Sequence, residues 1–142
     1  MPRRGFVAVA FREQPYQSLV ADLALETHVV DDTDVNCDVC FSLRLGADGL
    51  VLLRLSMVGP YAMVEADRGS GRADLVASQA DCRTDLEHFV IKVLMHHGLL
   101  PLSWPRLAVR VDLALPDVGE PTVYNALFAP EDDFTRVEPE PW

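Results

Sequence analysis

Apolar and polar residues alternate strictly in the middle of the chain, between residues 39 and 57. Successive side chains of a β-strand point to opposite faces, so this period of two predicts two strands, each with one apolar face. An Asp-Gly pair within residues 47–49 separates the strands and is typical of a hairpin, because glycine tolerates a positive φ. The apolar positions are Val39, Phe41, Leu43 and Leu45 in the first strand, and Val51, Leu53, Leu55 and Met57 in the second.

A third strand is expected directly after this hairpin. Gly59-Pro60 ends the second strand, and residues 61–65 again read as a strand, which completes an antiparallel meander. The positions between the apolar ones are mostly polar, so the meander is predicted to have a single dry face. A hairpin alone is marginally stable in water, and other elements must therefore cover that face.

Two amphipathic helices can provide this cover. Pro15 suits a first helical turn, and the apolar spacing that follows predicts a helix over residues 15–26. Thr84-x-x-Glu87 fits a capping box at the start of a second helix, with Asp81 as another cap candidate, and Gly98 suits its left-handed end. The apolar face of the second helix is expected to contain Leu86, Phe89, Val90, Val93, Leu94 and His97.

The remaining segments are less regular. Residues 6–11, 107–111 and 122–128 are predicted as strands, the last with Val123 and either Tyr124 or Ala126 facing inward. Residues 27–38 are predicted to be a connection, and residues 67–72 a flexible break. Residues 73–80 form either a short strand or a loop. Residues 129–142 are predicted to be an extended or disordered tail that is acidic and rich in proline. The predicted fold is α+β: one domain over residues 1–128, with an antiparallel sheet of four to six strands and two helices packed on one face.

Composition narrows the classes of partner. The 142 residues carry a net charge of −10, which disfavours binding to nucleic acid and to an anionic membrane surface and favours a basic partner protein. The same charge also serves solubility. No apolar run approaches the roughly 18 residues of a membrane span, and the short run at 5–11 lacks a clear signal-peptide cleavage site. With only three cysteines, the sequence favours a cytoplasmic protein with free thiols.

The candidate metal motifs are incomplete. Cys37 and Cys40 form a C-x-x-C, but Cys82 is the only other thiol, and the four histidines have no recognised zinc spacing. Asp32-x-Asp34-x-Asn36 resembles the start of a calcium loop, but its sixth position would be Cys37 instead of glycine and its twelfth Leu43 instead of glutamate. His96 and His97 are neighbours on one helix and point about 100° apart, too far to chelate one ion. We therefore expect no metal site, no cofactor and no catalytic residue.

The acidic stretch at 31–38 is interpreted as an exposed negative patch that contacts a partner. Together with the small size and the charge, it favours a non-catalytic binding protein of inhibitor or immunity type that masks a basic protein; a homodimer is compatible with the sequence. The residues expected to bind the partner are Asp31, Asp32, Asp34 and Asp38.

Two alternatives remain open. The predicted order of elements, a helix, three strands, a helix and further strands, is similar to that of type III secretion chaperones, and the resemblance implies an acidic secretion chaperone. The likeness covers element order and no shared motif. The third class is an enzyme or small-ligand binder that uses a pocket the sequence does not show.

Overall fold

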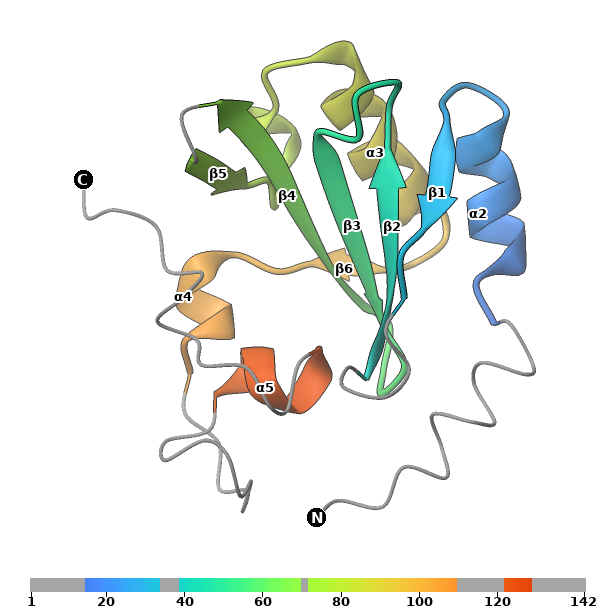
Figure 1. The fold of residues 1–142 in the computed structure, drawn as a ribbon. Coiled ribbons are helices and arrows are strands. Elements are labelled where there is room, and N and C mark those ends of the chain that lie inside the picture. The colour runs from blue at the N-terminus through green and yellow to red at the C-terminus, as the bar shows by residue number, and fades with distance from the viewer. Residues whose placement is uncertain (1–14, 34–38, 70–71, 110–121, 129–142) are drawn as a thin grey trace.

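The computed structural model describes residues 15–33, 39–69, 72–109 and 122–128. Within them, six strands form one sheet in the order β1-β2-β3-β4-β5, antiparallel throughout, with β6 added to β4 in parallel (Figure 1). The expected α+β fold is confirmed. The strands are β1 (Val29–Asp31), β2 (Cys40–Leu45), β3 (Val51–Ser56), β4 (Tyr61–Gly69), β5 (Arg72–Leu75) and β6 (Leu100–Pro101), and the helices are α2 (Gln17–Ala24), α3 (Asp85–His96), α4 (Trp104–Leu107) and α5 (Val123–Leu127), with a 3₁₀ turn at Gln79–Asp81.

In the central meander, the apolar residues predicted to share one face of the sheet do so. Leu53 on β3 lies opposite Leu43 on β2 and Val64 on β4, so these three side chains share one face of the sheet. All three are almost fully buried. This face carries the main hydrophobic core, which α2 and α3 cover; in Figure 1, α3 lies behind the strands and α2 lies at the right-hand edge.

Helix α3 begins and ends where its sequence predicts. The Thr84 hydroxyl oxygen accepts a hydrogen bond from the backbone N–H of Glu87 at 3.1 Å, and Gly98 beyond the C-terminal end has a φ of 74°. The buried arc of the helix includes Ile91 as well as Val90 and Leu94, and is therefore wider than the predicted stripe. None of the helices in the described part of the chain has the length and apolar character that crossing a bilayer requires.

The strand predicted at 122–128 is wrong, because these residues form helix α5. Thr122 and Asn125 form a capping box at its start, in which the Thr122 backbone N–H donates to the Asn125 side-chain oxygen at 3.0 Å. The helical spacing brings Tyr124 and Phe128 to one side, where both are fully buried. The strand predicted from residue 107 is also wrong at its start, since Leu107 is the last residue of α4.

The other face of the sheet is not simply polar. A second hydrophobic core lies there, formed where α4 and α5 pack below the strands (Figure 1). Backbone pairing fixes α5 in place, because the Val39 N–H donates to the Phe128 carbonyl at 2.9 Å. The expectation of a single dry face is therefore corrected. The buried residues of this second core are Cys40, Met63, Leu102, Leu107, Tyr124 and Phe128.

Strands β1 and β6 were not predicted, and β5 lies where the sequence allowed either a strand or a loop. The segment 27–38, expected to be a connection, contains β1, which pairs with the end of β2. The flexible break expected at 67–72 is corrected at both of its ends, since β4 continues to Gly69 and pairs there with Arg72 on β5; residues 70 and 71 lie outside the described part of the chain. The strand β6 joins β4 by parallel pairing. The strand predicted at 6–11 and the tail predicted at 129–142 lie outside the described residues.

Candidate functional site

Negative charge is concentrated where α2 and β1 lie, at the right-hand edge of the sheet in Figure 1. Residues 15–33, which form these two elements and their connection, include no lysine or arginine. We call this part of the surface the acidic edge. Its carboxylates are those of Asp22, Glu26, Asp31 and Asp32.

An apolar groove opens beside the acidic edge, between α2 and the neighbouring strands. It has a volume of about 310 Å³. The side chains of Phe41, Leu43 and Leu55 line it from the sheet, and each is at most 5% exposed. Asp31 is the only charged residue that the described part of the chain contributes to its lining, and we call this cavity the Asp31 groove. The remaining lining residues are Tyr16, Gln17, Val20, Ala24 and Val29.

The strand register and a local turn position the carboxylate of Asp31. Asp31 pairs with Leu43 across β1 and β2, so its side chain lies on the same face of the sheet as the apolar lining. One carboxylate oxygen, Oδ1, accepts from the backbone N–H of Thr33 at 2.9 Å, and the Thr33 hydroxyl oxygen accepts from the Ser42 N–H at 2.9 Å. Among the described residues the second oxygen, Oδ2, has no hydrogen-bond partner, and it is free to accept from a ligand.

Tyr16 fixes the other wall of the groove. Its hydroxyl donates to the carbonyl oxygens of Ser56 at 2.6 Å and Gly59 at 3.2 Å, which ties the start of α2 to the turn after β3. Its ring meets Phe41 edge to face, with 5.7 Å between ring centroids. Burial raises the pKa of Tyr16 above 10.0, so the phenol keeps its proton and continues to donate. These contacts fix the Tyr16 side chain, and this wall of the groove therefore has a defined shape.

The combination of an apolar lining and one carboxylate suits a long cationic side chain. Lysine and arginine carry three or four methylene groups that pack on apolar surface while the charged end stays at the rim. A charged nitrogen that donates to a carboxylate makes one of the stronger protein hydrogen bonds. A neutral apolar side chain would fill the groove and leave Asp31 unused.

The structure separates the acids that were predicted to act together. Asp31 lines the groove, whereas Asp32 points to the opposite face and forms an ion pair with Arg44 at 3.4 Å. The side chains of Asp32 and Arg44 are 60% and 50% exposed, so this pair contributes little to stability. Asp34 and Asp38 lie outside the described residues. Sequence reasoning missed the strand β1 itself, although the β-branched pair Val29-Val30 is a signal for it.

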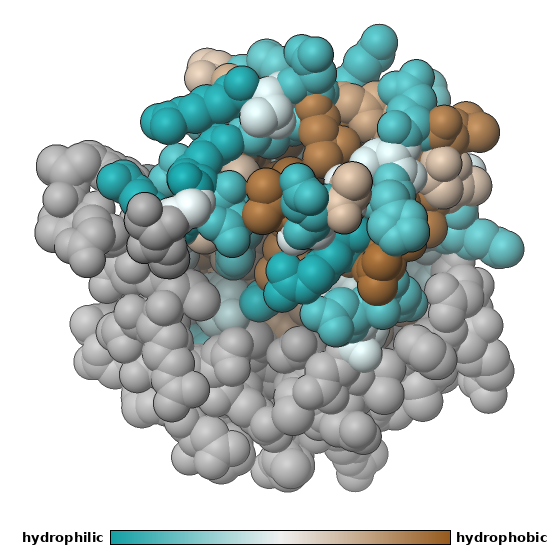
Figure 2. Space-filling model, turned by 45° about the horizontal axis from the view of Figure 1, so that its top comes forward, coloured by the Kyte–Doolittle hydropathy of each residue, from teal (hydrophilic) through white to brown (hydrophobic). Residues whose placement is uncertain are grey.

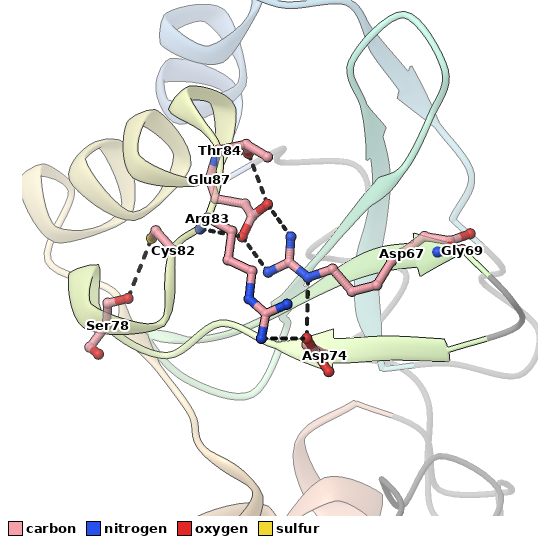
Figure 3. Close-up of polar contacts among 9 residues, drawn as sticks. Asp67, Gly69, Asp74, Ser78, Cys82, Arg83, Thr84 and Glu87 are labelled. Carbon is pink, nitrogen blue, oxygen red and sulfur yellow. Dashed lines mark hydrogen bonds and ion pairs between the residues drawn. The ribbon is translucent and has the colours of Figure 1, made fainter.

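A second polar cluster joins the N-terminal end of α3 to the hairpin of β4 and β5 (Figure 3). The Arg68 guanidinium donates to both carboxylate oxygens of Glu87, at 2.6 and 2.7 Å, and its Nε donates to Asp74 at 3.2 Å. The Thr84 hydroxyl and the Arg83 backbone N–H also donate to Glu87, at 2.8 and 3.1 Å. Because its acceptors are occupied from within the chain, we interpret this cluster as an anchor for α3.

The described cysteines are free thiols with different surroundings. Cys40 is buried in the second core, and Cys82 is half-buried beside the carbonyl of Ser78, to which its thiol donates at 3.4 Å. Burial raises the pKa of Cys82, and the nearby carboxylates of Glu87 and Asp81 raise it further. The thiol is thus held in its protonated form, which is the less nucleophilic one. The third cysteine of the sequence, Cys37 of the C-x-x-C, lies outside the described residues.

Two histidines form side-chain hydrogen bonds, and the rings of His96 and His97 meet edge to face. His97 Nε2 and Asp22 Oδ2 are 2.6 Å apart and link α3 to α2, while His88 bonds to Gln79. In the described part of the chain, no three side chains of histidine, cysteine, aspartate or glutamate are grouped so that they could hold a metal ion.

Comparison with protein-family models, with curated proteins and with solved structures finds none that matches this chain.

Proposed function

We propose that this protein is a small non-catalytic binding protein, of inhibitor or immunity type, that captures a basic partner protein at the Asp31 groove. The observation that carries the proposal is the carboxylate of Asp31 at an apolar groove of about 310 Å³. The net charge of −10 supports the choice of a basic partner. The groove supplies a specific contact, and the surrounding acids supply attraction at longer range.

Binding begins with electrostatic steering. Complementary charge raises the rate of encounter between two proteins and loses this effect as salt screens it. The acidic edge has four carboxylates; Asp32 is paired with Arg44 and Asp22 with His97, whereas no ion pair within the described residues engages Asp31 or Glu26. A basic surface on the partner is therefore drawn to the side of the molecule where the groove opens.

The bound state depends on one inserted side chain. A lysine or arginine of the partner lies with its methylene groups against Val20 and Leu43 and donates from its charged end to Asp31. Removing apolar surface from water contributes about 25 cal/mol per Å², and the charged hydrogen bond contributes about 1.5–3 kcal/mol. The neighbouring apolar residues of the partner segment pack on the half-buried wall around Tyr16.

Asp31→Asn should weaken binding about tenfold, which corresponds to the loss of about 1.4 kcal/mol. Asparagine keeps the oxygen that accepts from Thr33, so the turn after β1 is preserved, and it replaces the second oxygen by an uncharged NH2 group that cannot accept from the cation. The measurement starts from a random peptide library displayed on phage and selected against the immobilised full-length chain. Enriched peptides should contain lysine or arginine beside apolar residues, and their affinities for both proteins are then compared by titration calorimetry.

Asp48→Asn is the matched control. Asp48 is an exposed carboxylate in the turn between β2 and β3, and it is not part of the groove lining. This variant removes the same charge and should change affinity less than about twofold at physiological salt. Enriched peptides without cationic residues, or peptides that bind Asp31→Asn as tightly as the unchanged chain, would contradict the proposed function.

A further inference from the structure

A second and larger groove lies between helices α2 and α3. Its volume is about 600 Å³, and it is separate from the Asp31 groove, which lies between α2 and the sheet. Figure 2 shows hydrophobic side chains exposed among hydrophilic ones toward the right-hand edge of the view, the side on which Figure 1 places α2. The residues that line this helix groove are Asp22, Leu25, Glu26, Phe89, Lys92, Val93, Met95 and His96.

Two large apolar side chains of this groove are unusually open to water. Leu25 is 81% exposed and Met95 is 63% exposed, the highest values among the exposed large apolar residues of the described chain. Phe89, beside them, is only partly buried. Single exposed apolar residues are common, but several that share one groove indicate an interaction surface.

The charges around the groove are divided between its two walls. The α2 side carries the carboxylates of Asp22 and Glu26, whereas the α3 side carries the ammonium of Lys92 and the imidazole of His96. Asp22 is bonded to His97 within the chain. Among the described residues, no ion pair joins Glu26 to Lys92, although both line the groove. Each therefore remains available to a partner of opposite charge.

We infer that the helix groove is the interface of a symmetric homodimer. In a two-fold dimer the same patch occurs on both subunits and must complement itself. A two-fold axis that runs along the groove places α2 of each copy over α3 of the other. Glu26 then faces the partner's Lys92, Lys92 faces the partner's Glu26, and Leu25 and Met95 are covered. The division of acid and base between the walls is the observation that selects a second copy as the occupant.

This dimer goes beyond the proposed function and does not depend on it. Asp31 is absent from the lining of the helix groove, and Leu25, Lys92 and Met95 are absent from that of the Asp31 groove. A dimer formed through the helices would leave both Asp31 grooves open, so one dimer would present two sites for the basic partner. The dimer can therefore be disproved while binding of a basic partner at the Asp31 groove holds, and the reverse is also true.

A charge-swap experiment tests the dimer. Sedimentation velocity on the full chain should give twice the monomer mass of 15.7 kDa. Lys92→Glu alone and Glu26→Lys alone each place like charges across the interface, and each should weaken dimerisation at least about tenfold. The double variant E26K/K92E restores opposite charges and should return the dimer affinity to within about threefold of the unchanged chain.

Two further variants separate interface effects from folding. Leu25→Glu changes a highly exposed side chain of the groove and should abolish the dimer while the circular dichroism spectrum remains that of the folded chain. Leu50→Glu changes an exposed leucine outside the groove, 48% exposed, and should leave the dimer intact. A monomer for the unchanged chain at concentrations up to roughly 100 µM, or a double variant no better than the single ones, would overturn the inference.

Discussion

Replacing Arg68 by alanine should lower the free energy of unfolding by about 3–5 kcal/mol. Glu87 is 1% exposed, and the two strongest hydrogen bonds to its carboxylate come from the Arg68 guanidinium. Without that cation, a buried carboxylate keeps only the donors of Thr84 and Arg83. An uncompensated buried charge is among the few causes of losses this large. Urea unfolding followed by circular dichroism gives the difference directly.

Two comparison variants identify the cause of that loss. Arg72→Ala removes a neighbouring arginine that is 56% exposed and contacts Asp74 at 3.5 Å, and it should cost less than about 1 kcal/mol. The double variant R68M/E87L replaces both charges by apolar side chains and should recover most of the lost stability. If Arg68→Ala unfolds at the same urea concentration as Arg72→Ala, the cluster does not anchor α3.

The same pair makes stability depend on pH. Burial by itself would raise the pKa of Glu87, but the hydrogen bonds from Arg68, Thr84 and the Arg83 backbone outweigh it, so the pKa lies below 4.5. A carboxyl whose pKa is lower in the folded state contributes stability above its unfolded pKa, and that contribution is lost as the pH falls through the folded value. The advantage of the unchanged chain over R68M/E87L should therefore shrink as the pH falls below about 4.5.

Phe128→Ala should cost about 3–5 kcal/mol of unfolding free energy, because it empties the centre of the second core. Phe128 is fully buried, and its carbonyl accepts from the backbone N–H of Val39, the residue just before β2. The loss should appear in both thermal and urea unfolding as one transition, since α5 packs on the same sheet as the main core. This prediction tests whether the segment after residue 121 is an integral part of the domain.

Val109→Ala is the control for this second core. Val109 is 54% exposed, although its carbonyl accepts from the Val123 N–H and so lies next to α5. Its truncation should change stability by less than about 0.5 kcal/mol. A Phe128→Ala variant as stable as Val109→Ala would place α5 away from the sheet and would restore the single dry face that the sequence suggests.

The meander was predictable because its signal is local and repeated. A shift of one residue would move Leu43 and Leu53 to the opposite face, so alternation, register and burial all require the same pairing. Helix α5 was not predictable in this way. Residues 122–128 are rich in aromatic and β-branched types that favour strands, and tertiary packing overrides that preference. The helical signals are the Thr122 cap with Asn125 three residues later and the four-residue spacing of Tyr124 and Phe128.

In the candidate site, too, the local feature was predictable and the long-range contacts were not. The acidic stretch that contains Asp31 and Asp32 is visible in the sequence, and one of these two residues lines the groove. The groove itself is assembled from α2, β1, β2 and β3, and its Tyr16 wall is held by backbone that lies 40 residues away. Contacts over such separations leave no periodic trace in a single sequence. The ion pair of Arg68 and Glu87 was hidden for the same reason.

Photo-cross-linking in the native cell tests most directly whether a basic protein occupies the Asp31 groove. Gln17 is exposed and lines the groove, so a benzoylphenylalanine placed there reaches any bound segment. The account predicts one dominant cross-linked protein with a positive net charge, reduced when Asp31→Asn is added and absent when the probe is at the exposed Leu50. Cross-links from position 17 that are equally strong with Asp31→Asn, or that capture an acidic protein, would contradict it.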